Sequence, residues 1–214
     1  MENYNIKIFR PFGPSVAKIS LPTNIIKNLN DYVDEIIKEE DKIKKLDHGK
    51  KLAGNVKQEL KLESEFIENS GLLKFLSTSV SKWINLSQGK KISKFNLIAS
   101  WVVRQFQNEY NPLHLHGGHV TGVGYLKVPK NLGETFQKEK VNNHNGKIIL
   151  VHGVQMFNSS SMFTLEPKVG DFYFFPNYLM HTVYPFYDSD EERRSVSFNA
   201  VIDENIYNTY NTYG

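Results

Sequence analysis

The chain has 214 residues, of which 40% are hydrophobic and 23% are charged, so its composition is that of a globular protein with one substantial core. The formal net charge is only +3, which argues against nucleic acid as a partner. Cysteine is absent, so disulfides, thiolate metal ligands and a cysteine nucleophile are excluded. Any chemistry must therefore use histidine, carboxylate or hydroxyl side chains.

The sequence shows no sign of a membrane segment or of a second domain. No apolar stretch approaches the length that spans a bilayer, and the first residues lack the apolar core of a secretion signal. We therefore expect a cytoplasmic protein with no membrane partner. A single domain over residues 1–214 is the simplest organisation.

Two segments before residue 93 have the apolar periodicity of amphipathic helices. Residues 24–43 place isoleucine, leucine, tyrosine and valine side chains on one stripe, with Thr23 as a candidate N-cap. Residues 72–84 repeat this pattern after Ser70 and Gly71. Both stripes should pack on a core, so residues 1–92 are predicted to be a supporting region of helices and strands.

From Phe95 onward the pattern changes to short β-rich segments separated by glycine, proline and asparagine. These segments are residues 96–106, 119–128, 147–153, 172–175, 181–186 and 194–202. Short, closely spaced strands favour a closed jelly roll or sandwich, because an open sheet would leave exposed edges. The fold class is therefore α+β and mainly β, with the N-terminal helices packed on a jelly-roll core at residues 93–203.

Two segments outside the predicted strands have a distinct composition. Residues 130–147 are rich in lysine and asparagine and are expected to form a long, mobile loop, of the kind that often carries substrate specificity at a barrel mouth. Residues 204–214 form a tail with several tyrosines and asparagines. This tail could dock on a second copy of the chain, as in a homodimer, or cap the barrel.

Three histidines in the run HLHGGH form the strongest local signal in the sequence. On an extended strand, side chains two positions apart point to the same face, so His114 and His116 can present two imidazoles to one site, whereas His119 has the opposite parity. His181 lies at the start of a later strand and is the candidate third imidazole. Such a set suits an open metal site with free coordination positions, although packing beside a turn is the alternative for these histidines.

A polar face is predicted for the strand that follows Glu192. Alternation places Arg193, Ser195, Ser197 and Asn199 on one side of this strand and apolar side chains mainly on the other. If the polar side lines the barrel, a bound carboxylate would satisfy the buried guanidinium of Arg193, with Ser195 adding a hydroxyl. If it faces solvent, the strand is an ordinary edge strand.

The sequence resembles the 2-oxoglutarate/iron(II) oxygenases, and within them a prolyl-hydroxylase-like branch of phage and bacterial genomes. The similar stretches are NPLHLHGGHVTGVGYLKVP, PKVGDFYFFPNYLMHTVYPF and EERRSVSFNA, which together span roughly the C-terminal half of the chain. Their order and spacing are more specific than any one of them. The first 90 residues match only weakly.

The resemblance implies a double-stranded β-helix, a cupin-like jelly roll, that holds iron(II) at its open end. His114 corresponds to the first histidine of the family's His-x-Asp/Glu element and His181 to its distal histidine. Arg193 and Ser195 look like the pair that grips the distal carboxylate of 2-oxoglutarate, and Tyr125 sits where relatives place a tyrosine near this co-substrate. The implied reaction converts 2-oxoglutarate into succinate and CO2 and hydroxylates a substrate, with ascorbate as a possible stimulant.

The chain departs from the family pattern at the third metal ligand. His116 stands where the family usually has a carboxylate, which makes His116 the expected third ligand. His119 could replace it if the two glycines break the strand, and Glu109 or Asp171 could supply a carboxylate from elsewhere.

Two other functions fit part of the sequence. One is a cupin-like enzyme that uses His114, His116 and His181 without 2-oxoglutarate. The other is a jelly-roll binding or virion module without catalysis, in which the histidines pack or hold a structural metal. Neither the substrate, small molecule or protein, nor the oligomeric state follows from the sequence. A phage-encoded protein of this kind would act in the host cytoplasm.

Overall fold

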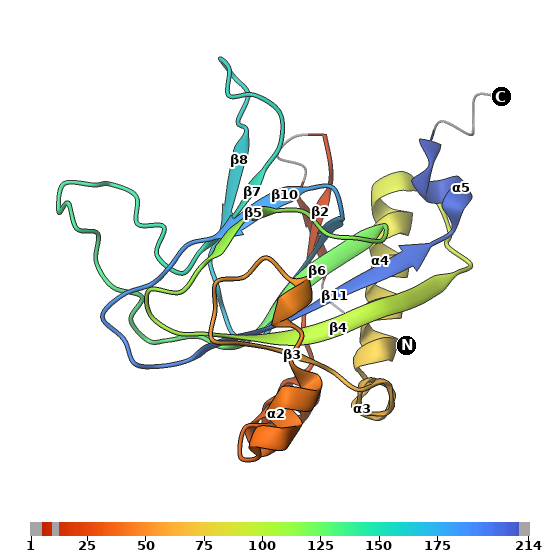
Figure 1. The fold of residues 1–214 in the computed structure, drawn as a ribbon. Coiled ribbons are helices and arrows are strands. Elements are labelled where there is room, and N and C mark those ends of the chain that lie inside the picture. The colour runs from red at the N-terminus through yellow and green to blue at the C-terminus, as the bar shows by residue number, and fades with distance from the viewer. Residues whose placement is uncertain (1–5, 10–12, 210–214) are drawn as a thin grey trace.

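The computed structural model describes residues 6–9 and 13–209, which form two β-sheets with helices packed on the larger one (Figure 1). Neighbouring strands are antiparallel throughout both described sheets. The larger sheet has the order β1 (Ile6–Phe9), β2 (Val16–Ser20), β9 (Asp171–Pro176), β6 (Val120–Lys127), β11 (Arg193–Ile202), β4 (Phe95–Gln105), β3 (Gln58–Lys61). The smaller sheet has the order β5 (Asn111–His114), β10 (Met180–Val183), β7 (Ile148–Val151), β8 (Met162–Leu165). The expected jelly-roll architecture is confirmed.

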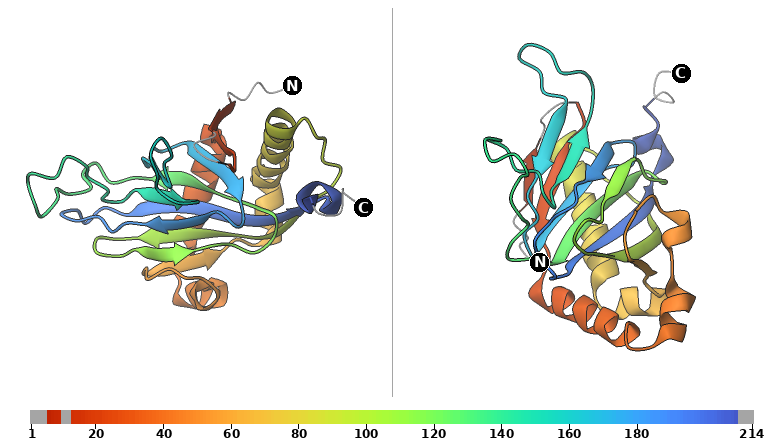
Figure 2. Two further views of the ribbon diagram at one scale, coloured as in Figure 1. Left: turned by 90° about the horizontal axis from the view of Figure 1, so that it is seen from above. Right: turned by 60° about the vertical axis from the view of Figure 1, so that its left-hand side comes forward.

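The helices come mostly from the part of the chain before residue 93. They are α1 (Thr23–Ile36), α2 (Glu40–Leu46), the 3-10 turn η1 (Gly49–Lys51), α3 (Ser64–Asn69), α4 (Leu72–Gln88) and, near the C-terminus, α5 (Glu204–Tyr207). Figure 2 shows α4 lying behind the strands of the larger sheet. Among the described helices, none combines the length and the apolar character that a bilayer crossing requires.

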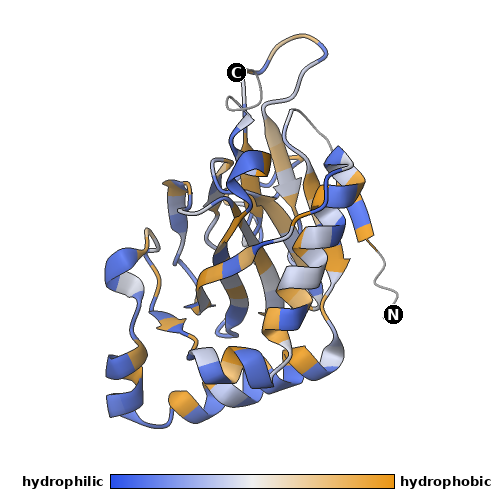
Figure 3. Ribbon diagram, turned by 90° about the vertical axis from the view of Figure 1, so that its right-hand side faces the viewer, coloured by the Kyte–Doolittle hydropathy of each residue, from blue (hydrophilic) through white to orange (hydrophobic). Residues whose placement is uncertain are grey.

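The structure has two hydrophobic cores, one on each face of the larger sheet. On the outer face, apolar side chains of α1 and α4 meet the rings of β9 and β11, as with Phe75 of α4 against Phe172 at 5.5 Å between ring centroids. In Figure 3 the hydrophobic residues of these helices lie in stripes beside polar ones. On the inner face, β6 and β9 pack against Ile148, Leu150 and Val183 of the smaller sheet. Both faces of the larger sheet are therefore covered by packed side chains.

Two glycines of β6 make the close packing of β9 possible. A Cβ atom on Gly124 would lie 2.3 Å from the Phe172 ring, and one on Gly122 would lie 2.4 Å from the carbonyl oxygen of Tyr173. Real Cβ atoms do not approach other atoms so closely, so only glycine fits at these positions. β6 and β9 can therefore lie side by side with stacked phenylalanine rings between the sheet and α4.

The predicted strands from Phe95 onward are all present, with small shifts at their ends, and the predicted helix at residues 72–84 is α4. The prediction of one helix over residues 24–43 was wrong, because the chain forms α1 and then α2 with a break at residues 37–39. The break lets α2 turn toward β3 and bury Leu46, so tertiary packing overrides local helix propensity there. Thr23 is the first helical residue and not the N-cap, which is Pro22.

The supporting region contributes more strands than its sequence pattern suggested. β1, β2 and β3 lie before residue 93 and form both edges of the larger sheet. Residues 128–147 contain no helix or strand, as expected for a long loop, and Figures 1 and 2 show this segment extending away from the sheets. In the predicted tail, α5 covers Glu204–Tyr207, and residues 210–214 lie outside the described residues.

Candidate metal and co-substrate site

The two sheets place three histidines in one cluster. His114 ends β5 and His181 lies in β10, and the two residues are directly opposite each other in the antiparallel pair. His116 follows two residues after the end of β5, where its backbone N–H donates to the carbonyl of Asn177 at 3.0 Å. The strand pairing and this loop contact thus bring the three imidazoles together.

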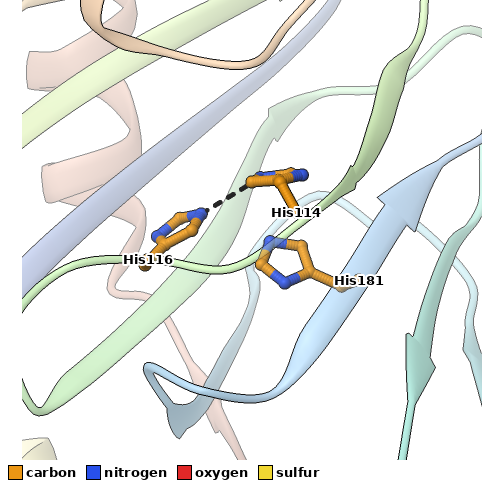
Figure 4. Close-up of side chains that lie close together, drawn as sticks. All are labelled: His114, His116 and His181. Carbon is orange, nitrogen blue, oxygen red and sulfur yellow. Dashed lines mark hydrogen bonds between the residues drawn. The ribbon is translucent and has the colours of Figure 1, made fainter.

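The three rings point toward one another (Figure 4). The ring centroid of His114 lies 4.3 Å from that of His181 and 5.2 Å from that of His116. One ring nitrogen from each histidine lies within 4.8 Å of the other two. The predicted set of His114, His116 and His181 therefore converges on one point, as a metal site requires.

Hydrogen bonds select one tautomer for each of the three rings. The Nδ1 atom of His114 lies 2.7 Å from the carbonyl oxygen of Pro112, and that of His181 lies 3.0 Å from the carbonyl oxygen of Leu179. Because a carbonyl can only accept, both Nδ1 atoms carry hydrogen and donate it. Both Nε2 atoms are therefore left with free lone pairs, the form in which a histidine binds a metal.

His116 is held in the same way by side chains of the larger sheet. Its Nδ1 atom lies 2.9 Å from Oδ1 of Asn199 and 2.7 Å from the hydroxyl of Thr121, which itself donates to the carbonyl of Phe198. With hydrogen on Nδ1, the Nε2 atom of His116 is an acceptor, yet it lies 3.2 Å from Nε2 of His114, the contact dashed in Figure 4. Two lone pairs at this distance have no hydrogen to share, so a cation between them would be stabilising.

Burial keeps the imidazoles neutral. Desolvation, followed by the neighbouring histidines, lowers the pKa of His181 to about 3, and desolvation with the charge of His114 lowers the pKa of His116 to about 4. The pKa of His114 is also lowered, again mainly by burial. Neutral imidazoles at neutral pH are the species that coordinate a divalent metal without first losing a proton.

The other candidates for the third ligand are engaged elsewhere. His119 stacks on the ring of Tyr207 at 3.9 Å, and its Nδ1 accepts from the backbone of Ile202. The carboxylate of Glu109 accepts from the backbone N–H of Phe106 at 2.8 Å. Asp171 forms an ion pair with Lys18 at 2.6 Å. None of these three residues belongs to the cluster formed by His114, His116 and His181.

The polar face predicted for β11 lines the cavity that contains the histidines. This cavity of about 220 Å³ is bounded by all three imidazoles together with Arg193, Ser195, Ser197 and Asn199. Arg193 is only 2% exposed, so the edge-strand alternative is excluded for this face. The guanidinium and the imidazoles thus line the same cavity.

Arg193 is a buried cation without a counter-charge among the described residues. Its Nη1 donates to Oε1 of Gln105 at 2.9 Å, whereas its Nε and Nη2 atoms are buried with no hydrogen-bond partner. Desolvation lowers the pKa of Arg193, but a guanidinium stays protonated in proteins. Buried unpaired donors on a permanent charge are costly, so the arrangement fits an anionic ligand such as a carboxylate.

Tyr125 lies beside this cation. Its ring centroid is 5.0 Å from the guanidinium carbon of Arg193, and its fully buried hydroxyl also lacks a hydrogen-bond partner. Burial raises the pKa of Tyr125, which keeps the hydroxyl protonated and able to donate. Tyr125 and Arg193 thus offer three unfilled donor atoms in one place, consistent with a bound oxyanion.

Several supporting residues did not follow from the sequence. Gln105 lies on the cavity face of β4 together with Trp101 and Val103, but its bond to Arg193 depends on the register of β4 and β11. Thr121 and Asn199 were not recognised as partners of His116, because they reach it from two other strands. Periodicity gives the face of a strand, whereas these contacts require the order of strands in the sheet.

Part of the chain matches a known protein family. Residues 99–199 match the family described as "Putative 2OG-Fe(II) oxygenase". This range contains all three histidines as well as Tyr125 and Arg193. No curated protein matches the sequence.

The fold is similar to those of solved oxygenase structures. The viral collagen prolyl hydroxylase of Paramecium bursaria Chlorella virus-1, in its 2OG complex, aligns over 86% of this chain and 94% of its own with 17% identity and a TM-score of 0.55. A Pseudomonas putida prolyl-4-hydroxylase aligns over 86% and 91% with 15% identity and a TM-score of 0.51. HygX from Streptomyces hygroscopicus, with nickel and 2-oxoglutarate bound, aligns over 86% and 80% with 12% identity and a TM-score of 0.54. The two-sheet fold is therefore a double-stranded β-helix.

Proposed function

We propose that this chain is a 2-oxoglutarate/iron(II) oxygenase, the family that its residues 99–199 match. In this proposal His114, His116 and His181 bind the iron(II) ion, and Arg193 binds the distal carboxylate of 2-oxoglutarate. The protein is thus an oxidoreductase, a non-haem iron(II) and 2-oxoglutarate-dependent dioxygenase. When bound, iron(II) and 2-oxoglutarate supply the oxidising chemistry, in which dioxygen gives one oxygen atom to succinate, formed with CO2, and the other to a substrate. The family favours this reaction over a cupin-like enzyme without 2-oxoglutarate or a structural module.

The main support for the proposed site is Arg193, which is buried and lacks a counter-charge. It lines the same cavity as three neutral imidazoles whose Nε2 atoms can bind a metal. Arg193 would bind one carboxylate through Nε and Nη2, while Gln105 holds the third arm of the guanidinium. Ser195 lines the same cavity and would add a hydroxyl, and the buried hydroxyl of Tyr125 would add a further donor. These residues bind and orient the co-substrate.

The three imidazoles leave the charge of iron(II) undiminished by the protein. A dianionic co-substrate would neutralise it, so a site without a protein carboxylate is electrostatically reasonable. The carbonyls of Pro112 and Leu179 and the amide of Asn199 would hold the rings in the orientation that presents Nε2 to the metal. The metal-binding geometry thus depends on both sheets.

The test is metal uptake combined with succinate formation. Purified protein given iron(II), ascorbate and 2-oxoglutarate should bind one metal ion per chain and form succinate slowly even without a substrate. The His181→Ala variant should lose both properties, whereas His119→Ala, which lies outside the cluster, should keep the metal. An unchanged metal content in His181→Ala, or no binding of 2-oxoglutarate by the wild type, would refute the proposed site.

Other properties remain proposals that rest on the sequence. We propose a cytoplasmic location, in the host if the chain is encoded by a phage, and a substrate that is a small molecule or a protein side chain and not a nucleic acid. The nearly balanced charge supports the last point. Homodimerisation through the C-terminal tail would be tested by the mass of the protein in solution with and without residues 204–214.

A further inference from the structure

Glu59 is a buried carboxyl that faces the active-site cavity and has no cationic partner. It lies in β3, at the edge of the larger sheet, and is only 3% exposed. It belongs to the lining of the cavity that contains the three histidines and Arg193. Among the described residues, no ion pair or hydrogen bond satisfies its side chain. A carboxyl that is only 3% exposed and has no partner within the described protein is available to a ligand that enters the cavity.

The register of the larger sheet places Glu59 in the same cavity as the proposed co-substrate site, but two strands away from Ser195. Glu59 is directly opposite Val103, which is opposite Ser195, which in turn is opposite Tyr125. Residues opposite one another in antiparallel strands share a face, so these four side chains form one row. Two strand spacings separate the backbones of Glu59 and Ser195, roughly 10 Å. This separation leaves Glu59 on the side of the cavity away from the residues proposed to bind 2-oxoglutarate.

The surroundings of Glu59 are built from acceptor atoms and glycines. The charge of Asp47 and, above all, burial raise the pKa of Glu59 to about 7. A Cβ atom on Gly54 would lie 2.6 Å from Oε1 of Glu59 and 2.9 Å from Oδ1 of Asn111, so both side-chain ends pack closely on the backbone of Gly54. Lys51 lines the same cavity but is exposed and forms no ion pair with Glu59. The carboxyl of Glu59 therefore lies beside a second carboxylate, that of Asp47, and has no cationic partner among the described residues.

We propose that Glu59 is a substrate-binding residue that receives a cationic nitrogen group of the substrate, an ammonium or a guanidinium. This inference rests on the proposed function, because it assigns to the substrate the part of the cavity that the metal and the co-substrate would leave unoccupied. A ligand carboxylate would be repelled by Glu59 and Asp47, and a neutral group would leave the charge of Glu59 uncompensated. Leu52 and Ala53, also in the cavity lining, would contact the aliphatic part of such a substrate.

The test compares cationic probes with neutral analogues of the same shape. The cationic probes are L-lysine and L-arginine as free amino acids and the same residues as N-acetyl methylamides, which stand for protein side chains. Norleucine and citrulline, free and in the same blocked form, are the neutral probes. Binding is measured by calorimetry on the wild type, Glu59→Gln and Glu59→Asp, each loaded with nickel(II) and 2-oxoglutarate. Glu65→Gln, which removes the same charge from the exposed surface of α3, is the matched control.

We expect at least one cationic probe to bind the wild type and Glu65→Gln at least 10-fold more tightly than Glu59→Gln, with partial recovery in Glu59→Asp. Neutral probes should bind all four proteins equally weakly. A preference for the free or the blocked form would distinguish a metabolite from a protein substrate.

Three results would overturn the inference. They are equal binding of the cationic probe by the wild type and Glu59→Gln, neutral probes that bind as tightly as cationic ones, and no binding of any cationic probe. The affinity for 2-oxoglutarate, measured in the same samples, separates these results from a failure of the proposed function. If the wild type binds 2-oxoglutarate but Glu59 does not discriminate among probes, only the assignment of Glu59 fails.

Discussion

The two faces of β11 carry neighbouring buried arginines in opposite situations. On the outer face, Arg194 is fully buried and donates to Glu192, Asp34 and the backbone carbonyl of Asn30. These two carboxylates raise the pKa of Arg194 despite its burial. On the cavity face, Arg193 has one neutral partner and two unfilled donors.

The two arginines show that the same residue type can stabilise the fold on the outer face of β11 and offer a ligand-binding group on its cavity face. Arg194 has its counter-charges within the fold, so its charge is compensated as soon as the chain folds. Arg193 has none, so its charge is balanced only when an anion enters the cavity. Two adjacent residues of one strand can thus be distinguished by their partners, although their burial is nearly the same.

The largest expected effect is on co-substrate affinity. Replacing Arg193 with methionine removes the cation that would pair with the carboxylate of 2-oxoglutarate, which should cost about 2–5 kcal/mol of binding free energy. Calorimetry should therefore show an affinity roughly 30-fold to several thousand-fold lower. Metal content should stay at the wild-type level, and the free energy of unfolding should not fall, because an unpaired buried charge has been removed. A large loss of stability in this variant would contradict the comparison with Arg194.

The complementary substitution should act on stability. Arg194→Met leaves the carboxylate of Glu192, whose side chain is 12% exposed, with Arg104 as its remaining ion-pair partner. We expect the free energy of unfolding to fall by about 3 kcal/mol, measured by urea denaturation. A variant as stable as the wild type would show that Arg194 is not the structural member of the pair.

A smaller effect is expected from the support of His116. Asn199→Ala removes the acceptor that holds the Nδ1 hydrogen of His116, leaving Thr121 as its partner. Loss of such an orienting contact typically lowers metal affinity about 10- to 100-fold. Competition with a chelator would measure the change. Ser197→Ala, on the same face of β11 but with no contact to a histidine ring among those described, is the control, and equal effects of both variants would contradict this role.

The smallest effect concerns the pH dependence of stability. Burial raises the pKa of Glu59 from 4.5, its ordinary value in an unfolded chain, to about 7 in the folded protein. Between these two pH values the folded protein therefore binds more protons at this residue than the unfolded chain does. Stability from this residue is therefore highest at low pH and declines as the pH rises from about 4.5 through 7. Glu59→Gln should remove this decline, worth about 2 kcal/mol after allowance for solvent contact. Urea denaturation of both proteins at pH 5 and pH 8 measures this decline. If the free energies of unfolding of the variant and the wild type differ by the same amount at both pH values, the prediction is wrong.

The parts of the molecule that could be predicted from the sequence are those with strict periodicity. The alternation of residues 193–199 predicted the polar face of β11. The expected closeness of the His114 and His116 imidazoles is confirmed, although β5 ends at His114 and His116 lies in the loop that follows, not on the strand. The family resemblance selected His181 over other histidines, and residues 99–199 match the family described as "Putative 2OG-Fe(II) oxygenase".

The parts that could not be predicted depend on which strands are neighbours. β3 is a four-residue edge strand of mixed polarity, so neither its pairing with β4 nor the inward direction of Glu59 has a periodic signal. The break between α1 and α2 likewise reflects the packing of Leu46 and not a helix-breaking residue. Local patterns determine the face of an element, but contacts across the cavity arise only from the assembled sheets.

The most direct test of the central claim is the coupling between metal and 2-oxoglutarate in one cavity. Calorimetric titration of 2-oxoglutarate should be done with the wild type and Arg193→Met, each with nickel(II) and each without metal. We predict 1:1 binding that is strong only when both the metal and Arg193 are present, and weak in the other three combinations. Wild-type affinity in Arg193→Met, or binding by the wild type that does not depend on the metal, would contradict it.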